Sequence, residues 1–137
     1  MSTAVLLSIK PEFAEAIFSG EKKYEFRKAI YKNKSVKVIY VYASAPISKV
    51  IGSFHVDKIL ENDLETLWKC TNDAAGISEA YFHEYFADRS FGFALKVEKA
   101  KLFDEPIRGW PAGRGQCHAP AGQAAFLQQY QRHGCRL

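Results

Sequence analysis

The sequence is poor in cysteine and has no long apolar run, and each of these absences argues against a class of protein. The 137 residues hold only three cysteines, Cys70, Cys117 and Cys135, with no Cys-x-x-Cys pair, so neither a disulfide framework nor a structural zinc is expected. No apolar run approaches the ~20 residues that span a bilayer, and residues 1–9 carry no basic leader or small-residue cleavage site. We therefore expect a soluble cytoplasmic protein with no metal, no other cofactor and no membrane partner.

Several motifs of cofactor and metal chemistry are also absent. The chain contains neither Gly-x-Gly-x-x-Gly nor Gly-x-x-x-x-Gly-Lys-Ser/Thr, which argues against dinucleotide binding and P-loop phosphate chemistry. His55 and His83 lie far apart in the sequence and do not predict a metal site. Cys70 has no adjacent histidine, which argues against a catalytic thiolate.

Charge is unevenly distributed along the chain. Residues 1–107 are balanced, whereas residues 108–137 contain no acid and supply the whole net charge of +4. Within the balanced part, residues 21–37 hold seven basic residues against two acids, and residues 57–88 hold eight acids against two lysines. A dense basic segment can attract phosphates, although a solvated lysine-rich face is the commoner reason for such a run.

Residue spacing predicts the elements of secondary structure. Apolar residues that alternate predict strands, and apolar residues at helical spacing predict helices. Pro11 suits the first turn of a helix, Gly20 its left-handed end, and Ser78 a helix N-cap, while Gly52 predicts a bulge in a strand. Strands are expected at residues 4–9, 23–27, 36–42, 49–60, 91–97 and 101–103, and helices at 11–19, 64–68 and 78–86.

This order predicts an α+β domain of residues 1–107, with helices inserted at two places into a small curved or closed sheet. Residues 108–137 differ in kind, because they hold five of the nine glycines and show no usable period. They predict an extension that wraps the sheet or is partly disordered. An Arg/Gly-rich nucleic-acid arm is the alternative for this segment.

One motif carries a family resemblance. Residues 20–27 have the form Gly-x-Lys-x-x-Glu-x-Arg, which resembles the signature of the ASCH domain, a branch of the PUA-like superfamily. Residues 7–19 resemble the opening strand and helix of that family, and residues 40–44 resemble a later strand. The resemblance covers about three quarters of the chain, through about residue 107. It implies a PUA-like small β-barrel with a cleft beside the first helix.

The resemblance also implies a function. ASCH proteins are regarded as RNA-binding modules, and some members are enzymes acting on nucleosides or RNA. One bacterial branch hydrolyses N4-acetylcytidine, using a lysine at the position of Lys22 to activate a threonine at the position of Glu25. This sequence has a carboxylate there, which cannot serve as the same hydroxyl nucleophile.

The charged residues of the motif have a definable chemistry of their own. Glu25 and Arg27 lie two apart on an expected strand, so their side chains share a face at roughly 6–7 Å. Lys22 lies three positions before Glu25, so strand alternation alone would point it to the other face. It reaches the face of Glu25 only if the turn after Gly20 rotates it inward. The three side chains can hold a phosphate or a base edge, and a buried Lys22 can act as a proton shuttle. A structural ion pair is the alternative.

Weaker candidates accompany the motif. Lys10, Ser8 and Ser44 can line the same cleft from the ends of two strands, and Tyr42 offers a stacking face. Each of these is an ordinary surface or core residue on the alternative interpretation. The aromatic side chains of the last expected helix have the spacing of a packing face and are interpreted as core, as is Trp68: Tyr81, Phe82, Tyr85 and Phe86.

Three hypotheses for function follow. The first is a module that binds RNA, a nucleoside or a nucleotide through Lys22, Glu25 and Arg27, with single-stranded or looped RNA favoured because splayed bases can enter a pocket. The second is an enzyme in which Lys22 and Glu25 are the catalytic pair, either a hydrolase of an N4-acetylcytidine-type amide or a ribonuclease. The third is a regulatory protein-interaction domain in which the cluster is structural.

Overall fold

Five strands and three α-helices make up residues 4–108, the part of the chain that the computed structural model describes. The mixed α+β class is as predicted. In chain order, the elements are β1 (Ala4–Ile9), α1 (Pro11–Ser19), β2 (Tyr24–Arg27), β3 (Val38–Ala43), β4 (Lys49–Asp63), α2 (Leu64–Thr71), a short 3-10 helix (Asn72–Ala74), α3 (Glu79–Tyr85) and β5 (Phe91–Arg108). Apart from Arg108, the predicted extension of residues 108–137 lies outside the described residues.

The strands form one sheet in the order β1-β3-β4-β5-β2. Strands β1 and β3 pair in parallel, and the other neighbours pair antiparallel. The predicted closed barrel is not formed, because β1 and β2 are the two edges of the sheet and no ladder joins them within residues 4–108. A side chain links the two edges: Arg27 Nη1 donates to the Ser8 carbonyl oxygen at 3.2 Å. We call this place, where the end of β1 faces β2, the seam.

Two long strands form the middle of the sheet, and one of them differs from the prediction. The separate strands expected at 91–97 and 101–103 are a single strand, β5, whose register against β4 shifts at several points. The predicted bulge at Gly52 is present as one of these shifts. A Cβ at Gly52 would lie 2.5 Å from the Lys101 carbonyl oxygen and 2.6 Å from the Phe18 ring, so only glycine allows this close approach.

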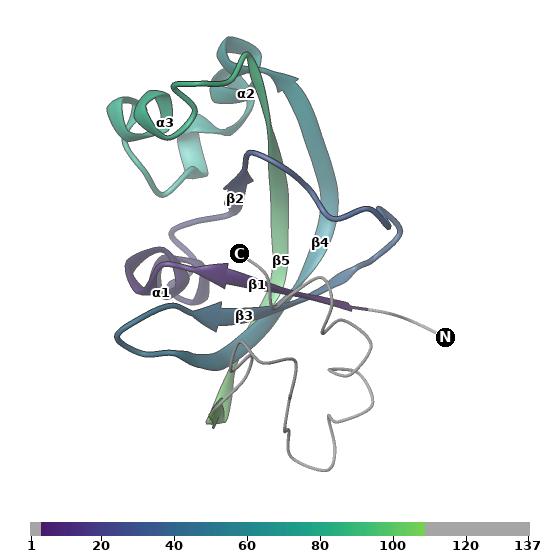
Figure 1. Cartoon of the computed structure of the whole chain (residues 1–137), viewed down its shortest axis with the longest axis vertical. Helices are drawn as coiled ribbons and strands as arrows, with labels where there is room; N and C mark the ends of the chain where they lie inside the picture. Colours follow the sequence, from purple (N-terminus) through teal and green to yellow (C-terminus); the bar gives the residue numbers. More distant parts are fainter. Residues whose placement is uncertain (1–3, 109–137) are drawn as a thin grey trace.

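Helix α1 covers the sheet next to the seam. Pro11 occupies its first turn, and Gly20 ends it in the left-handed conformation with φ 94°, as the sequence predicts. Ala14 and Ile17 face inward and join the main apolar core, which also contains Phe54 and Leu95. Figure 1 shows α1 and α3 on the same side of the long strands β4 and β5, with β2 between them.

A separate aromatic core lies under α2 and α3. Phe82 and Phe86 are fully buried, with their ring centroids 4.9 Å apart, and Phe26 of β2 meets Phe82 edge to face at 5.3 Å. These contacts fix α3 against β2. None of the helices among residues 4–108 is both long and apolar enough to cross a bilayer.

Candidate functional site

A cavity of about 240 Å³ opens at the seam. Its walls come from the end of β1, the start of α1, the motif on β2, and α3 with the loop before it. Since each water occupies about 30 Å³ in the liquid, this cavity has the room of roughly eight waters. The lining residues are Ser8, Ile9, Lys10, Phe13, Lys22, Glu25, Phe26, Arg27, Ile77, Tyr81 and Tyr85.

The turn after α1 rotates Lys22 into this cavity. The Lys22 N–H donates to the Ala16 carbonyl at 3.0 Å, and the next N–H, of Lys23, donates to the Ala74 carbonyl at 2.8 Å. These two bonds tie the turn to α1 on one side and to the segment after α2 on the other. These bonds consequently bring Lys22 to the same face as Glu25, although strand alternation alone would place the two side chains on opposite faces.

The Lys22 side chain is nearly completely enclosed. It is only 2% exposed, and its Nζ donates to the Ala75 carbonyl at 2.8 Å. The Phe26 and Phe13 rings lie 4.8 and 5.3 Å from Nζ, so the ammonium sits over two aromatic faces. Gly76, with φ 71°, packs directly on the Lys22 stem.

Glu25 and Arg27 form the second half of the site. The Glu25 carboxylate is also buried, at 6% exposure, and its Oε2 lies 3.6 Å from Arg27 Nη1. The same Nη1 donates to the Ser8 carbonyl, so the guanidinium links the carboxylate to the opposite edge of the seam. The cavity is lined by three cations, Lys10, Lys22 and Arg27, and by one carboxylate, that of Glu25. This balance of charge favours a ligand carrying negative charge.

Burial shifts the pKa values of Lys22 and Glu25 in opposite directions. Desolvation lowers the pKa of Lys22, and the charge of Glu25 opposes that shift. Desolvation raises the pKa of Glu25, and the charges of Lys22 and Arg27 oppose that shift. An amine that releases its proton more easily than usual and a carboxyl that holds its proton more strongly are suited to exchange protons with a ligand.

Aromatic side chains form the wall opposite the motif. Tyr81 and Tyr85 lie four residues apart on α3 and so face the cavity one above the other. The Tyr81 and Phe13 rings meet edge to face at 5.3 Å. Burial raises the pKa of Tyr85, which therefore keeps its hydroxyl proton at neutral pH.

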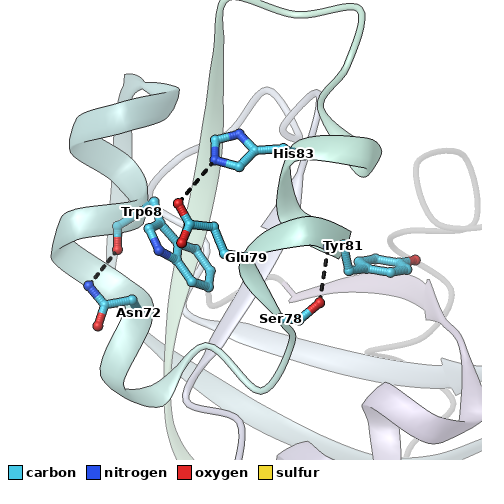
Figure 2. A network of polar contacts seen from close by, with 6 residues as sticks. All are labelled: Trp68, Asn72, Ser78, Glu79, Tyr81 and His83. Atoms are coloured by element: carbon cyan, nitrogen blue, oxygen red, sulfur yellow. Dashed lines mark hydrogen bonds and ion pairs between the residues drawn. The ribbon is translucent and has the colours of Figure 1, made fainter.

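Figure 2 shows the local polar contacts of α3 together with the position of the Tyr81 ring. Ser78 caps the helix by accepting from the Tyr81 N–H at 3.0 Å, as the sequence predicts. Glu79 and His83 pair at 3.5 Å on the side of α3 near Trp68, while the Tyr81 ring projects away from them. The helix therefore turns one face to α2 and presents its tyrosines to the seam.

The structure brings together five of the residues singled out in the sequence and leaves two apart. Tyr42 lies on the other face of the sheet, against the apolar cluster of Ala4, Leu6 and Tyr40. Ser44 follows β3 and donates its N–H to the Ile9 carbonyl at 3.0 Å, outside the cavity lining. The five that line the cavity are Ser8, Lys10, Lys22, Glu25 and Arg27.

Sequence reasoning missed the tyrosine wall. Tyr81 and Tyr85 were expected in the core with Phe82 and Phe86, but only the two phenylalanines are fully buried. The tyrosine hydroxyl groups were the available signal. Tyr81 and Tyr85 lie on one stripe of this helix, and Phe82 and Phe86, which lack a hydroxyl, lie on the next.

Comparison with known proteins identifies the family of the chain. The model of the ASCH domain family matches residues 7–101. An ASCH domain-containing ribonuclease of Zymomonas mobilis is 36% identical over 93 residues, which cover 66% of this chain and 63% of the relative. A crystal structure of a serine-to-alanine variant of ZmASCH from Zymomonas mobilis matches with a TM-score of 0.74 at 30% identity, over 86% of this chain and 84% of that one.

A more distant relative is a large ribosomal subunit protein of Ureaplasma parvum, 26% identical over 103 residues that cover 74% of this chain and 33% of the relative. The chain thus spans less than two thirds of the length of these curated relatives. The family match nevertheless covers most of the described elements, from β1 into β5, and includes the whole Gly-x-Lys-x-x-Glu-x-Arg motif. This chain belongs to the ASCH domain family.

Proposed function

We propose that this protein binds single-stranded or looped RNA, with one base inserted into the seam cavity. The observation that carries the proposal is the convergence of Lys22, Glu25 and Arg27 on an open cavity that is also lined by aromatic rings. Cationic donors match phosphates, a carboxylate can accept from an exocyclic amino group, and aromatic faces stack on bases. RNA is further supported by the similarity to the ASCH domain-containing ribonuclease of Zymomonas mobilis.

The size of the cavity favours an unpaired base. At about 240 Å³ the cavity is smaller than the roughly 300–1,000 Å³ of pockets that enclose drug-sized ligands. One base can enter if its sugar and phosphates stay outside, which requires a base free of its partner and its stack. A double helix cannot supply such a base without opening, so we expect loops and single strands to bind best.

Ribonuclease activity is the second candidate function, favoured by the Lys22–Glu25 pair. Hydrolysis of a phosphodiester needs a base for the attacking hydroxyl, an acid for the leaving oxygen, and positive charge at the phosphate. Glu25, when ionised, can accept the first proton, Lys22 can donate the second, and Arg27 can hold the phosphate. The oppositely shifted pKa values of the two buried groups suit these roles.

The other hypotheses have less support. Hydrolysis of an N4-acetylcytidine-type amide by the mechanism of the bacterial branch would need a hydroxyl nucleophile where this chain has Glu25. A purely structural ion pair does not account for the open cavity on which Glu25 and Arg27 converge. The enclosed position of Lys22 gives no support to a regulatory protein-interaction role.

The affinity for RNA should depend strongly on Arg27. Because a hydrogen bond to a charged group contributes about 1.5–3 kcal/mol, we expect Arg27→Ala to weaken binding of a short unstructured RNA by roughly 10–150-fold. Lys58→Ala is the matched control, since Lys58 lies on β4 away from the cavity lining. Fluorescence anisotropy at low salt measures both affinities, and circular dichroism verifies the fold. Equal losses in the two folded variants would contradict binding at the seam.

A further inference from the structure

Two lysines are each placed over one of the tyrosines that line the cavity, and only Lys10 belongs to the lining itself. Lys10 Nζ lies 5.9 Å from the centre of the Tyr81 ring, and Lys28 Nζ lies 5.2 Å from the centre of the Tyr85 ring. Lys10 directly follows β1, and Lys28 directly follows β2, so they stand on opposite edges of the seam. Lys10 is exposed and the Lys28 side chain is 36% exposed, so both ammonium groups can meet a ligand from solvent.

Both lysines lie beside helix α3. Tyr81 and Tyr85 are four residues apart, which is about 6 Å along a helix at 1.5 Å per residue, so the two lysines stand beside successive turns of the same helix face. The phosphates on either side of one inserted base can therefore each meet one lysine.

From this arrangement we infer that the site takes a nucleotide from the interior of an RNA strand, its base in the cavity and its two flanking phosphates on Lys10 and Lys28. The inference rests on the proposed function and names its substrate class. A free nucleoside carries no phosphate and a mononucleotide only one, so neither can engage both lysines. A nucleotide at a strand end lacks one flanking phosphate and loses one of the two contacts.

Lys28 has a competitor for the phosphate. Asp88 Oδ1 lies 3.4 Å from Lys28 Nζ, and the Asp88 side chain is 69% exposed. A phosphate that binds Lys28 must displace or share this carboxylate, which repels it. Removing the charge of Asp88 should therefore strengthen RNA binding, whereas removing Lys28 should weaken it. Opposite effects from the two partners of one ion pair distinguish a phosphate contact from a merely structural pair.

The test measures RNA affinity as a function of salt concentration for four variants of the full chain. For a single strand, each phosphate contact contributes about 0.7 to the slope of log affinity against log salt. We expect Lys10→Ala and Lys28→Ala each to reduce the slope by about 0.7, Asp88→Asn to tighten binding, and Lys58→Ala to change neither. A mononucleotide should bind far more weakly than a short unstructured RNA, with an affinity that responds to at most one of the two lysine variants.

The outcomes separate this inference from the function on which it rests. Unchanged slopes in Lys10→Ala and Lys28→Ala, with RNA binding still lost in Arg27→Ala, would overturn the inference and leave the proposed function standing. A mononucleotide that binds as tightly as the RNA, or weaker RNA binding in Asp88→Asn, would overturn it as well. If the wild-type protein binds no RNA, the proposed function fails and the inference fails with it.

Discussion

If the proposed ribonuclease activity is present, replacing Lys22 with methionine should lower the rate of RNA cleavage by about 10²–10⁴-fold, the usual contribution of a general acid or base. Methionine keeps an unbranched apolar stem against the Phe13 and Phe26 rings but cannot carry a proton. The variant should lose some stability, because removing one charge from a buried group of charges usually destabilises and the Ala75 carbonyl loses its Lys22 donor. The loss is limited because Glu25 keeps Arg27 as a partner.

The neighbouring lysine provides the control for this experiment. Lys23 is exposed and does not line the cavity, so Lys23→Met should cleave RNA at nearly the wild-type rate. Single-turnover cleavage followed on a denaturing gel measures the chemical step directly, and thermal unfolding checks that both variants are folded. A folded Lys22→Met protein that cleaves as fast as the Lys23→Met protein would exclude Lys22 from the chemistry.

Replacing Gly76 with alanine should cause a large loss of stability for so small a change. Gly76 has φ 71°, where a residue with a Cβ pays about 1–2 kcal/mol. The new Cβ would lie 2.5 Å from the Lys22 Cβ, so the backbone that positions Lys22 must move. Overpacking of this kind costs typically 1–3 kcal/mol. The two costs together predict a decrease of about 2–5 kcal/mol in the free energy of unfolding.

A second glycine isolates the packing cost. Gly20 also has a positive φ, 94°, but a Cβ there meets nothing within 4 Å. Gly20→Ala therefore pays only the backbone cost, and the difference between the two variants in urea unfolding should be about 1–3 kcal/mol. Equal losses would show that Gly76 does not support Lys22. Where Gly76→Ala remains folded, its RNA affinity should fall as well, because its Lys22 is displaced.

Local sequence rules predicted the parts of the site that lie close together in the chain. Pro11 and Gly20 delimit α1, and the motif that follows Gly20 places Lys22, Glu25 and Arg27 within eight residues. These features depend on φ angles, capping and strand alternation, which are legible in a single sequence. The sequence leaves the position of Lys22 conditional, because the turn that carries it is tied down by the Lys23 N–H, which donates to the distant Ala74 carbonyl.

Long-range packing determined the parts that were missed. Tyr81 and Tyr85 reach the cavity only because Phe82 and Phe86 dock α3 against β2, a contact between distant segments. Tyr42 was a candidate for its stacking face, with a core position on the alternating strand as the alternative. It packs against the apolar cluster of Ala4, Leu6 and Tyr40 and does not line the cavity.

The closed barrel was expected from family resemblance and strand count. Its absence reflects a register that no local pattern encodes: β1 ends opposite β2 without pairing, and Arg27 spans the gap to the Ser8 carbonyl. That unpaired seam is also where the cavity opens, so the feature that the sequence did not reveal is the one that creates the candidate site.

The most direct measurement is the carbon NMR signal of the Glu25 carboxyl, followed through a pH titration and then with added RNA. In the free protein Glu25 should titrate above the ordinary value of 4.5, because burial raises its pKa. Addition of a short unstructured RNA should shift the Glu25 signal while the signals of exposed carboxyls such as Glu65 and Glu79 stay in place. An RNA complex that leaves the Glu25 signal unchanged would contradict the seam cavity as the place where RNA binds.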